Sequence, residues 1–219
     1  ELTHLASLYH DDVMDSAPTR RGAPAAHEVW GNSVAILAGD LLFARASQTV
    51  AGLGAEAVRI QAETFERLCV GQLHETIGPQ EGEDPVAHHL GVLAGKTGSL
   101  IAASAHFGAL FGGLEGEQLD AVVAYGERVG VAFQLADDVL DLTSSALVLG
   151  KVPGTDLREG VPTMPVLLLR RAVEQGSDDG SGAQILAALA GDLSADDALA
   201  AVVTLLREHP VMEQAREMA

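Results

Sequence analysis

The sequence is poor in cysteine, aromatic residues and basic residues. Its single cysteine, Cys69, excludes an internal disulfide and fits a cytoplasmic location. Thirteen basic residues stand against 31 acidic ones, for a formal net charge of −18. Such a surface repels nucleic acid and anionic membranes, so we expect neither as a partner. No apolar run reaches the roughly 18–20 residues of a membrane span, and no signal peptide is visible.

The remaining composition predicts a single all-α domain over residues 1–219. Alanine and leucine are abundant, and runs of β-branched residues are short. The first residues are already amphipathic, so we expect the chain to begin inside a helix and the domain to lack an N-terminal segment. The extreme C-terminus is also expected to be missing. Apolar periodicity and Gly/Pro breaks predict helices over about 2–15, 30–51, 55–77, 85–112, 117–143, 164–175, 182–191 and 195–207. A loop is expected over 16–24, and no strand is.

Two segments, HDDVMD and ADDVLD, repeat one arrangement of three carboxylates. The six residues are Asp11, Asp12, Asp15, Asp137, Asp138 and Asp141. The first and last aspartate of each set are four residues apart, which places them about one turn apart on one side of a helix. Like charges this close repel one another, and Mg²⁺ removes that cost because it binds one or two carboxylates together with phosphate oxygens. Both clusters are therefore predicted to bind Mg²⁺ and hold a phosphate.

A run of acidic residues is more often a solvated surface, and the chain offers two comparisons. The segments SDDG and ADDA lack an acid four residues after their first aspartate, and they lie beside turns or helix starts, where aspartate serves as a cap. The two full clusters interrupt long apolar helices instead. Carboxylates are costly there unless they face a filled cavity, which favours the metal interpretation.

Cationic and amide side chains accompany the clusters. Arg20 and Arg21 follow the first cluster and Lys151 follows the second, and each can donate charge-assisted bonds to phosphate. Lys96 and Thr97 lie in LAGKTGSL, which lacks the spacing of a P-loop. Gln134 precedes Asp137 by three residues on the same predicted helix. Together these residues indicate a polyphosphate held between metal ions and bases.

These residues, in this order, resemble the trans-polyprenyl diphosphate synthases over residues 1 to about 170. The two aspartate clusters match the two aspartate-rich motifs of that family. Asp40 in LAGDLL matches an aspartate near the family's active site. The other matching elements are Arg20-Arg21-Gly22, Lys96-Thr97, Phe133-Gln134, Lys151 and Gly154-Thr155-Asp156.

The resemblance implies an isoprenoid-synthase-type antiparallel helix bundle around a central cavity, usually as a homodimer. It implies three Mg²⁺ ions that hold an allylic diphosphate, which ionises and is attacked by isopentenyl diphosphate. Catalysis is expected from Asp11, Asp12, Asp15, Lys96 and Lys151, and metal binding from the six clustered aspartates. Substrate binding is expected from Arg20, Arg21, Asp40, Lys96, Thr97, Gln134 and Lys151.

Two departures from the family pattern are visible. The family binds isopentenyl diphosphate with a Gly-Lys-Arg-type motif and a histidine upstream of the first cluster, and this chain starts too late to contain them. Val161 in DLREGVP stands where family members often carry a lysine, although Arg158 lies nearby.

Two other functions stay open. A class I terpene cyclase also ionises an allylic diphosphate at DDxxD, but it usually replaces the second cluster with an Asn/Ser/Glu-type motif. A non-catalytic subunit of a heteromeric prenyl synthase tends to lose the aspartates, and this chain keeps all six. Asp12→Ala or Asp138→Ala is expected to lower turnover while leaving the fold intact.

Ala6 and Ser7 are the candidate determinants of product length. In the trans-polyprenyl diphosphate synthases, a large aromatic residue four or five positions before the first aspartate cluster closes the cavity and gives short products. Both residues are small here, so we expect geranylgeranyl or longer products. The alternative is that Ala6 packs against a neighbouring helix.

Other conspicuous residues are interpreted as structural. His10 adjoins the first aspartate pair and is expected to hydrogen-bond locally, the alternative being that it tunes that pair. Cys69 is expected to be a small core residue. His88 and His89 lack convergent ligands in the sequence, so they are predicted to lie at the surface or in an interface.

Overall fold

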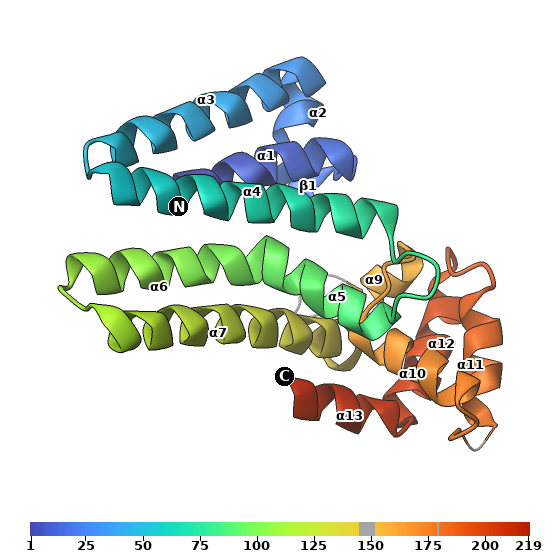
Figure 1. Cartoon of the computed structure of the whole chain (residues 1–219). Helices are drawn as coiled ribbons and strands as arrows, with labels where there is room; N and C mark the ends of the chain where they lie inside the picture. The colour runs from blue at the N-terminus through green and yellow to red at the C-terminus, as the bar shows by residue number, and fades with distance from the viewer. Residues whose placement is uncertain (145–151, 179) are drawn as a thin grey trace. The chain divides into compact units, whose positions relative to one another are not determined.

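The computed structural model describes residues 1–144, 152–178 and 180–219, and Figure 1 shows that these residues are mostly helical. The all-α class is therefore confirmed. Lys151 lies outside the described residues. The elements are α1 (Leu2–Met14), β1 (Thr19–Arg20), β2 (Ala23–Pro24), α2 (Ala26–Trp30), α3 (Asn32–Ala51), α4 (Ala55–Ile77), α5 (Pro85–Leu93), the π-helix η1 (Ala94–Gly98), α6 (Ser99–Phe111), α7 (Gly116–Thr143), α9 (Thr155–Arg158), α10 (Met164–Glu174), α11 (Ser181–Leu189), α12 (Asp196–Glu208) and α13 (Val211–Met218).

Packing divides the chain into two compact units, Glu1–Arg67 and Leu68–Ala219. The first unit contains one aspartate cluster and the second unit contains the other. Each unit is described by itself below. The prediction of a single domain over the whole chain stays a prediction.

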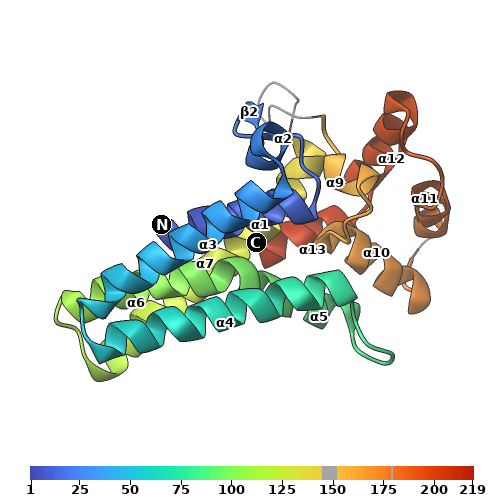
Figure 2. The ribbon, with the colours of Figure 1, turned by 90° about the horizontal axis from the view of Figure 1, so that it is seen from above.

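In the first unit, α1 packs closely against α3, and the two helices run side by side in Figure 2. Small residues make the approach possible, because α1 buries Ala6 and Ser7 while α3 buries Ala35 and Gly39. A Cβ atom on Gly39 would lie 2.4 Å from His10 Nε2 and 3.1 Å from the carbonyl oxygen of Ala6. The first aspartate cluster is therefore carried on a helix that is set tightly on its neighbour.

The segment between α1 and α2 contains a short hairpin where the sequence predicted only a loop. β1 pairs antiparallel with β2, with Arg20 opposite Ala23. Arg21 and Gly22 between them have φ values of 52° and 78°. Positive φ at both central residues is the pattern of a type I′ turn, whose twist matches that of the flanking strands. The hairpin therefore gives Arg20 a fixed backbone position.

The predicted helix over 30–51 is two helices in the structure. Gly31 separates α2 from α3 with a φ of 81°, which a side chain rarely adopts. Of the described helices, α3 is long and apolar enough to cross a membrane by length and composition. The statement that no run reaches that length is therefore wrong for this segment. Helices in the cores of soluble proteins can meet the same two criteria, and α3 packs on α1.

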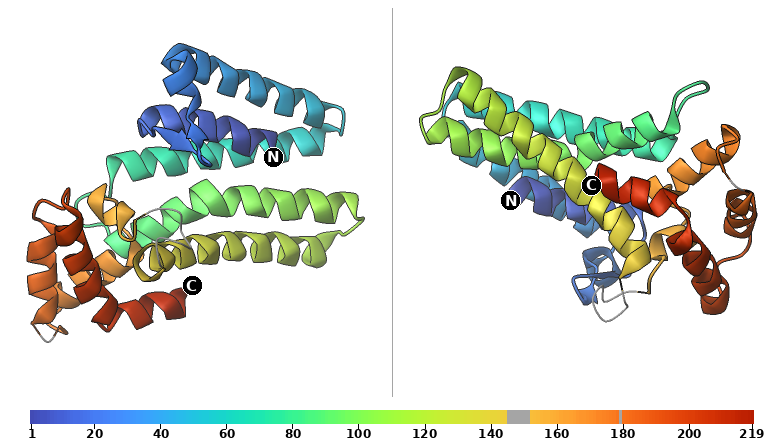
Figure 3. Two further views of the ribbon diagram at one scale, coloured as in Figure 1. Left: turned by 180° about the vertical axis from the view of Figure 1, so that it is seen from behind. Right: turned by 90° about the horizontal axis from the view of Figure 1, so that it is seen from below.

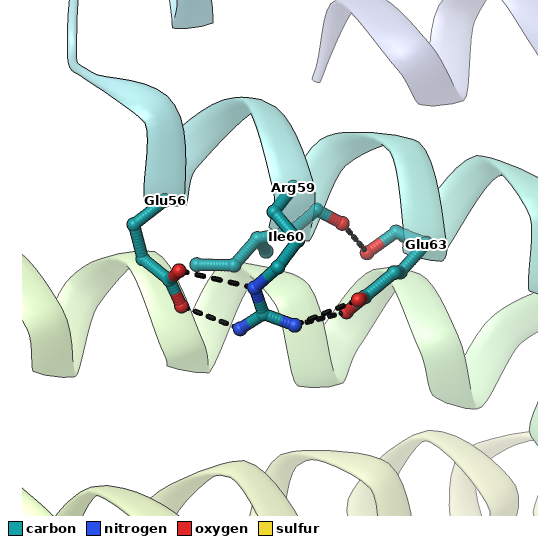
Figure 4. Close-up of polar contacts among 5 residues, drawn as sticks. Glu56, Arg59, Ile60 and Glu63 are labelled. Atoms are coloured by element: carbon teal, nitrogen blue, oxygen red, sulfur yellow. Dashed lines mark hydrogen bonds and ion pairs between the residues drawn. The ribbon is translucent and has the colours of Figure 1, made fainter.

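In the part of α4 that belongs to the first unit, Arg59 forms ion pairs along the helix and Gln61 bonds to α1. Figure 4 shows Arg59 between Glu56 and Glu63, with Arg59 Nε donating to Glu56 Oε2 at 3.0 Å and Nη1 to Glu63 Oε1 at 2.7 Å. These carboxylates raise the pKa of Arg59. Gln61 donates to Thr3 Oγ1 at 2.7 Å and so joins α4 to α1. The exposed side of α4 is therefore an ion-pair network, and a neighbouring side contacts the cluster-bearing helix.

In the second unit, α6 and α7 are antiparallel neighbours, as Figures 1 and 3 both show. A Cβ atom on Gly126 would lie 2.8 Å from the Ala105 side chain, and one on Gly130 would lie 2.7 Å from the Cα atom of Gly98. These two glycines of α7 therefore allow a backbone approach that a larger residue would prevent.

The predicted helix over 85–112 is interrupted by η1, a π-helical turn that carries Lys96 and Thr97. Ser99 Oγ donates to the Gly95 carbonyl oxygen at 2.6 Å. The turn lies against Gly130 on α7, and a Cβ atom on Gly71 of α4 would lie 2.9 Å from Lys96 N. Sequence periodicity did not reveal this widened turn, because it accompanies contacts with residues distant in the sequence. Such π turns are frequent at functional sites.

The C-terminal part of the second unit forms most of its apolar core. The six residues from Met164 to Leu169 of α10 are all buried, and α12 buries Leu199, Val202, Val203 and Leu206. α13, which the sequence analysis missed, begins after Pro210 and buries Val211, Met212 and Ala215. It packs on α7 and α10. A helix of eight residues is too short to stand out from periodicity alone, and its packing stabilises it.

The glycine contact between α7 and η1 gives a stability prediction. Gly130→Ala should lower the free energy of unfolding by about 1–3 kcal/mol, because the new methyl group meets backbone atoms that cannot move aside easily. Gly108→Ala on α6 meets nothing within 4 Å, so it should raise stability by up to about 1 kcal/mol through helix propensity. Urea unfolding followed by circular dichroism measures both. Equal effects of the two substitutions would contradict the close approach.

Candidate functional site

The first aspartate cluster lies at the C-terminal end of α1, and its three members differ in environment. Asp12 is 4% exposed, whereas Asp15 is exposed and caps the helix. Arg20 Nε donates to Asp12 Oδ1 at 2.7 Å, and Arg20 Nη2 contacts the same oxygen. The middle carboxylate is therefore engaged by the hairpin arginine, while Asp11 is half-buried and Asp15 lies open to solvent.

A pocket of about 280 Å³ in the first unit adjoins this ion pair. Its walls combine an apolar side with two arginines, which suits a ligand that has both an apolar and an anionic part. Trp30, which is 63% exposed, forms part of the wall. The lining residues are Leu5, Leu8, Tyr9, Asp12, Arg20, Arg21, Pro24, Ala25, Ala26 and Trp30.

Asp40 is connected to the first cluster through His10. His10 Nε2 lies 3.4 Å from Asp40 Oδ1 and 3.0 Å from the Ile36 carbonyl oxygen. His10 is the residue directly before Asp11, so its ring links α1 to α3 beside the cluster. The expectation that His10 hydrogen-bonds locally was therefore wrong, because the Ile36 carbonyl is 26 residues away in the sequence.

The second cluster lies near the C-terminal end of α7 and shows a similar division. Asp137 is exposed, but the Asp138 side chain is 13% exposed and Asp141 is 2% exposed. Asp138 Oδ2 accepts hydrogen bonds from Met164 N at 2.8 Å and from His89 Nε2 at 3.0 Å. The middle aspartate again binds donors from other elements.

Asp141 joins the cluster to the G-x-D element. Asp156 N lies 3.4 Å from Asp141 Oδ2, and Gly154 N donates to the Asp141 carbonyl oxygen at 2.9 Å. Gly154 has a φ of 80°, and a Cβ atom there would lie 2.5 Å from a methyl group of Val203. Glycine is therefore required at 154, and the resulting turn fixes the start of α9 against the cluster.

His89 is the site residue that sequence reasoning misjudged. It was predicted to lie at the surface or in an interface, but its side chain is 11% exposed and lies against Asp138. Its partner is 49 residues away in the sequence. No local pattern could reveal that contact, because it depends on how α5 packs beside α7.

Lys96 and Thr97 lie on η1, and Lys96 Nζ pairs with Glu75 on α4. Both partners belong to the second unit. Gln134 is half-buried on α7, one turn before Asp138. Lys96, Gln134 and the second cluster are thus carried by elements of one unit, whereas Arg20, Arg21 and Asp40 belong to the other.

The carboxylates of the two aspartate clusters suit a divalent cation whose remaining ligands are water and phosphate oxygens. Among the described residues, no group of three His, Cys, Asp or Glu side chains is arranged to hold a metal ion. Oxygen donors are nevertheless present in each cluster, and Mg²⁺ commonly takes one or two carboxylates with water and phosphate oxygens. The arrangement suits a cation that arrives with a phosphorylated ligand.

The contacts of Asp12 and Asp138 argue against the expectation that alanine at either position leaves the fold intact. Asp12→Ala removes the partner of Arg20, and Asp138→Ala leaves the donors Met164 N and His89 without their acceptor. A buried donor without an acceptor costs about 1–3 kcal/mol. A loss of activity in these variants would therefore combine the loss of a carboxylate from the cluster with a loss of stability.

The Asp12–Arg20 pair gives the second prediction. Arg20→Met should lower the free energy of unfolding by about 1–3 kcal/mol, because Asp12 is almost fully buried and loses a charge-assisted bond. Arg21→Met is the matched control, since Arg21 is exposed, and we expect a change within about 0.5 kcal/mol. Thermal and urea unfolding of both variants measure the difference. The same loss in both would show that Asp12 does not depend on Arg20.

Comparisons with known proteins identify the family of the chain. The sequence pattern of the polyprenyl synthetase family matches residues 1–206. The chain is 49% identical, over its full length, to the nonaprenyl diphosphate synthase of Mycobacterium tuberculosis, of which it covers 64%. It is 43% identical to a geranylgeranyl pyrophosphate synthase of Corynebacterium glutamicum, crystallised with calcium and isoprenyl diphosphate, with a TM-score of 0.82 over 98% of this chain and 63% of that one.

A polyprenyl synthetase of Streptomyces coelicolor A3(2) is 30% identical, with a TM-score of 0.86 over 99% of this chain and 66% of that one. The chain thus spans a little under two thirds of the length of several relatives. The family match nevertheless includes both aspartate clusters, the hairpin arginines and the Lys96–Thr97 turn. This chain belongs to the polyprenyl synthetase family.

Proposed function

We propose that the chain carries the active site of a Mg²⁺-dependent trans-prenyltransferase. The enzyme condenses isopentenyl diphosphate with an allylic prenyl diphosphate to give a longer trans-polyprenyl diphosphate and diphosphate. The observation that carries the proposal is the pair of carboxylate clusters, each with its middle aspartate held by donors from another element. Arg20 pairs with Asp12 of the first cluster, and Lys96 lies in the same unit as the second cluster. Each is a cation of the kind that binds a diphosphate.

The reaction breaks the allylic C–O bond, and its electron pair leaves with the diphosphate. The double bond of isopentenyl diphosphate then forms the new C–C bond to the allylic cation, and a proton is lost to the released diphosphate. Negative charge develops on the leaving group, so fixed cations lower the barrier. Bound Mg²⁺ would supply further positive charge to the same oxygens.

The chain's own residues prepare this charge stabilisation. Asp12 orients the guanidinium of Arg20 through two of its nitrogens, so little reorganisation is needed when phosphate binds. Glu75 pairs with Lys96, and a phosphate group would compete for the same ammonium group. We propose that Asp11, Asp15 and Asp137 offer the more accessible carboxylates to the cations, since each is more exposed than its neighbours Asp12 and Asp138. Asp138 can add its Oδ1 atom, because both of its donors bind Oδ2.

Incubation of the chain with Mg²⁺, an allylic diphosphate and isopentenyl diphosphate tests the proposal. Chromatography of dephosphorylated products distinguishes elongation, cyclisation and no reaction. Elongation supports the proposal. Cyclic products would support the terpene cyclase instead, and activity only after addition of a second, different subunit would support the heteromeric alternative.

Metal dependence is the third prediction. The chain should bind geranyl diphosphate with Mg²⁺ and lose this binding in excess EDTA. Asp15→Asn and Asp137→Asn should each weaken binding by about tenfold or more, because each removes an oxygen charge from the cation. Asp197→Asn, an exposed first-turn aspartate of α12, is the control and should change nothing. Calorimetry measures all four proteins, and full binding in EDTA would refute the role of the metal.

We also propose that Arg20, Arg21 and Lys96 belong to the allylic site, because these cations accompany the two aspartate clusters in the sequence. In the same calorimetric series, geranyl diphosphate should therefore bind more tightly than isopentenyl diphosphate.

Product length stays a proposal: geranylgeranyl or longer. Ala6 is fully buried, and its carbonyl oxygen lies near Gly39 at the contact between α1 and α3. Ser7 is 7% exposed, and its hydroxyl donates to the His4 carbonyl oxygen at 2.9 Å. Both side chains are small, which supports a cavity without an aromatic floor at this level. The burial of Ala6 equally fits a packing role against α3.

The fourth prediction separates these two roles. Ala6→Phe and Ser7→Phe should each shorten the main product by at least one five-carbon unit if the cavity passes α1 at this level. His4→Phe, on the same helix, is the control and should leave the product unchanged. Chromatography of products is paired with thermal unfolding, because an overpacked Ala6→Phe would lose about 1–3 kcal/mol of stability. Unchanged products from folded variants would show that residues elsewhere set the length.

A homodimer is proposed on the apolar face of α3. Val34, Leu37 and Leu41 form a stripe along this helix and are 50%, 66% and 60% exposed. Large apolar side chains in such a row are costly in water, and a second copy of the chain would cover them. We propose a cytoplasmic location from the single cysteine, Cys69, a partly buried thiol whose pKa burial raises.

A further inference from the structure

His89 contributes a side chain to the second cluster although it belongs to another helix. Its Nε2 atom lies 3.0 Å from Asp138 Oδ2, and the two side chains are 11% and 13% exposed. A hydrogen bond at this depth is shielded from water and keeps a defined geometry. The contact therefore restricts the orientation of the Asp138 carboxylate, as an exposed surface contact would not.

The same carboxylate oxygen also accepts from the start of α10. Met164 is the first residue of that helix, and its N–H group, at 2.8 Å from Asp138 Oδ2, has no acceptor within the helix. A negative charge at a helix N-terminus is favourable as well. Both donors use Oδ2, so the carboxylate plane is set and Oδ1 is the oxygen that a further ligand can share.

The helix that carries His89 is itself anchored to α10. Asp84, the N-cap of α5, accepts from Val86 N at 3.1 Å and from Arg171 Nη2 of α10 at 2.6 Å. The Arg171 bond holds the pKa of Asp84 below its usual range. α5 therefore meets α10 at two places, directly at Arg171 and through Asp138 at Met164, which limits how far His89 can move.

We propose that His89 is a positioning residue of the second cluster: it holds the Asp138 carboxylate in the orientation with which the cluster binds a divalent cation. The inference rests on the proposed function, because it needs a metal at this cluster. Donors that orient metal-site carboxylates typically contribute tenfold to a hundredfold in metal affinity. His89 acts through Asp138 and has no contact with substrate in this scheme.

His88 provides a matched control on the same helix. Its side chain is 10% exposed, close to the 11% of His89, and it contacts the His74 carbonyl oxygen at 3.1 Å and Glu83 at 3.2 Å. His88→Leu thus removes the same kind of side chain, at the same depth, away from the aspartates. A role in folding alone would make the two positions equivalent.

The experiment measures Mn²⁺ binding to the chain by electron paramagnetic resonance, with geranyl diphosphate present and with thermal unfolding recorded for each protein. His89→Leu should raise the Mn²⁺ dissociation constant about tenfold or more. His89→Gln, whose amide N–H can reach Asp138, should restore it to within about threefold of the wild-type value. His88→Leu should leave it unchanged. If His89→Leu does not fold, His89→Asn replaces it, and its shorter amide should fail to rescue binding.

The outcomes separate this inference from the function on which it rests. Wild-type Mn²⁺ affinity in folded His89→Leu or His89→Asn, or equal losses in the His88 and His89 variants, would overturn the role of His89 alone. A failure of His89→Gln to recover affinity would overturn it too. A wild-type chain that binds no Mn²⁺ with the diphosphate would overturn the proposed function together with the inference.

Discussion

A buried carboxylate must find hydrogen-bond donors or lose stability, and the site depends on how this constraint is met twice. Asp12 receives Arg20 from a hairpin, and Asp138 receives His89 and the first N–H group of α10. In both cases the donor comes from a different element, so satisfying the carboxylate also ties two or three elements together. The packing of neighbouring elements in each unit therefore sets the position of the middle aspartate in its cluster.

Because only some aspartates of each cluster are buried and hydrogen-bonded to other elements, the members of a cluster have different roles. The anchored aspartates define geometry, whereas Asp15 and Asp137 remain exposed and can approach a cation. Asp141 belongs with the anchored group, because Asp156 N lies against its carboxylate and Gly154 donates to its backbone. Repulsion among neighbouring carboxylates is reduced when some of them are neutralised or hydrogen-bonded by the protein. Fewer charges then remain for the metal to offset.

Close backbone packing likewise fixes the turn that carries Lys96. Gly71 and Gly130 let α4 and α7 approach the π turn that carries Lys96 and Thr97. A widened turn changes the direction of side chains relative to a regular helix, so the rotation of Lys96 follows from contacts with two other helices. Glu75 on α4 then holds its ammonium group within the same unit. The position of this cation is thus a property of packing.

The sequence by itself determined the all-α class, most helix positions and the two aspartate clusters with Arg20 and Lys96, because periodicity, helix breaks and short spacings are local. It could not determine the hairpin at Arg20–Ala23, the π turn at Ala94–Gly98 or α13, which tertiary contacts stabilise against weak local preference. It also placed His89 wrongly, and it treated all six aspartates as equivalent. Only the tertiary structure distinguished them, since burial and hydrogen-bond donors for Asp12 and Asp138 come from residues 8 to 49 positions away.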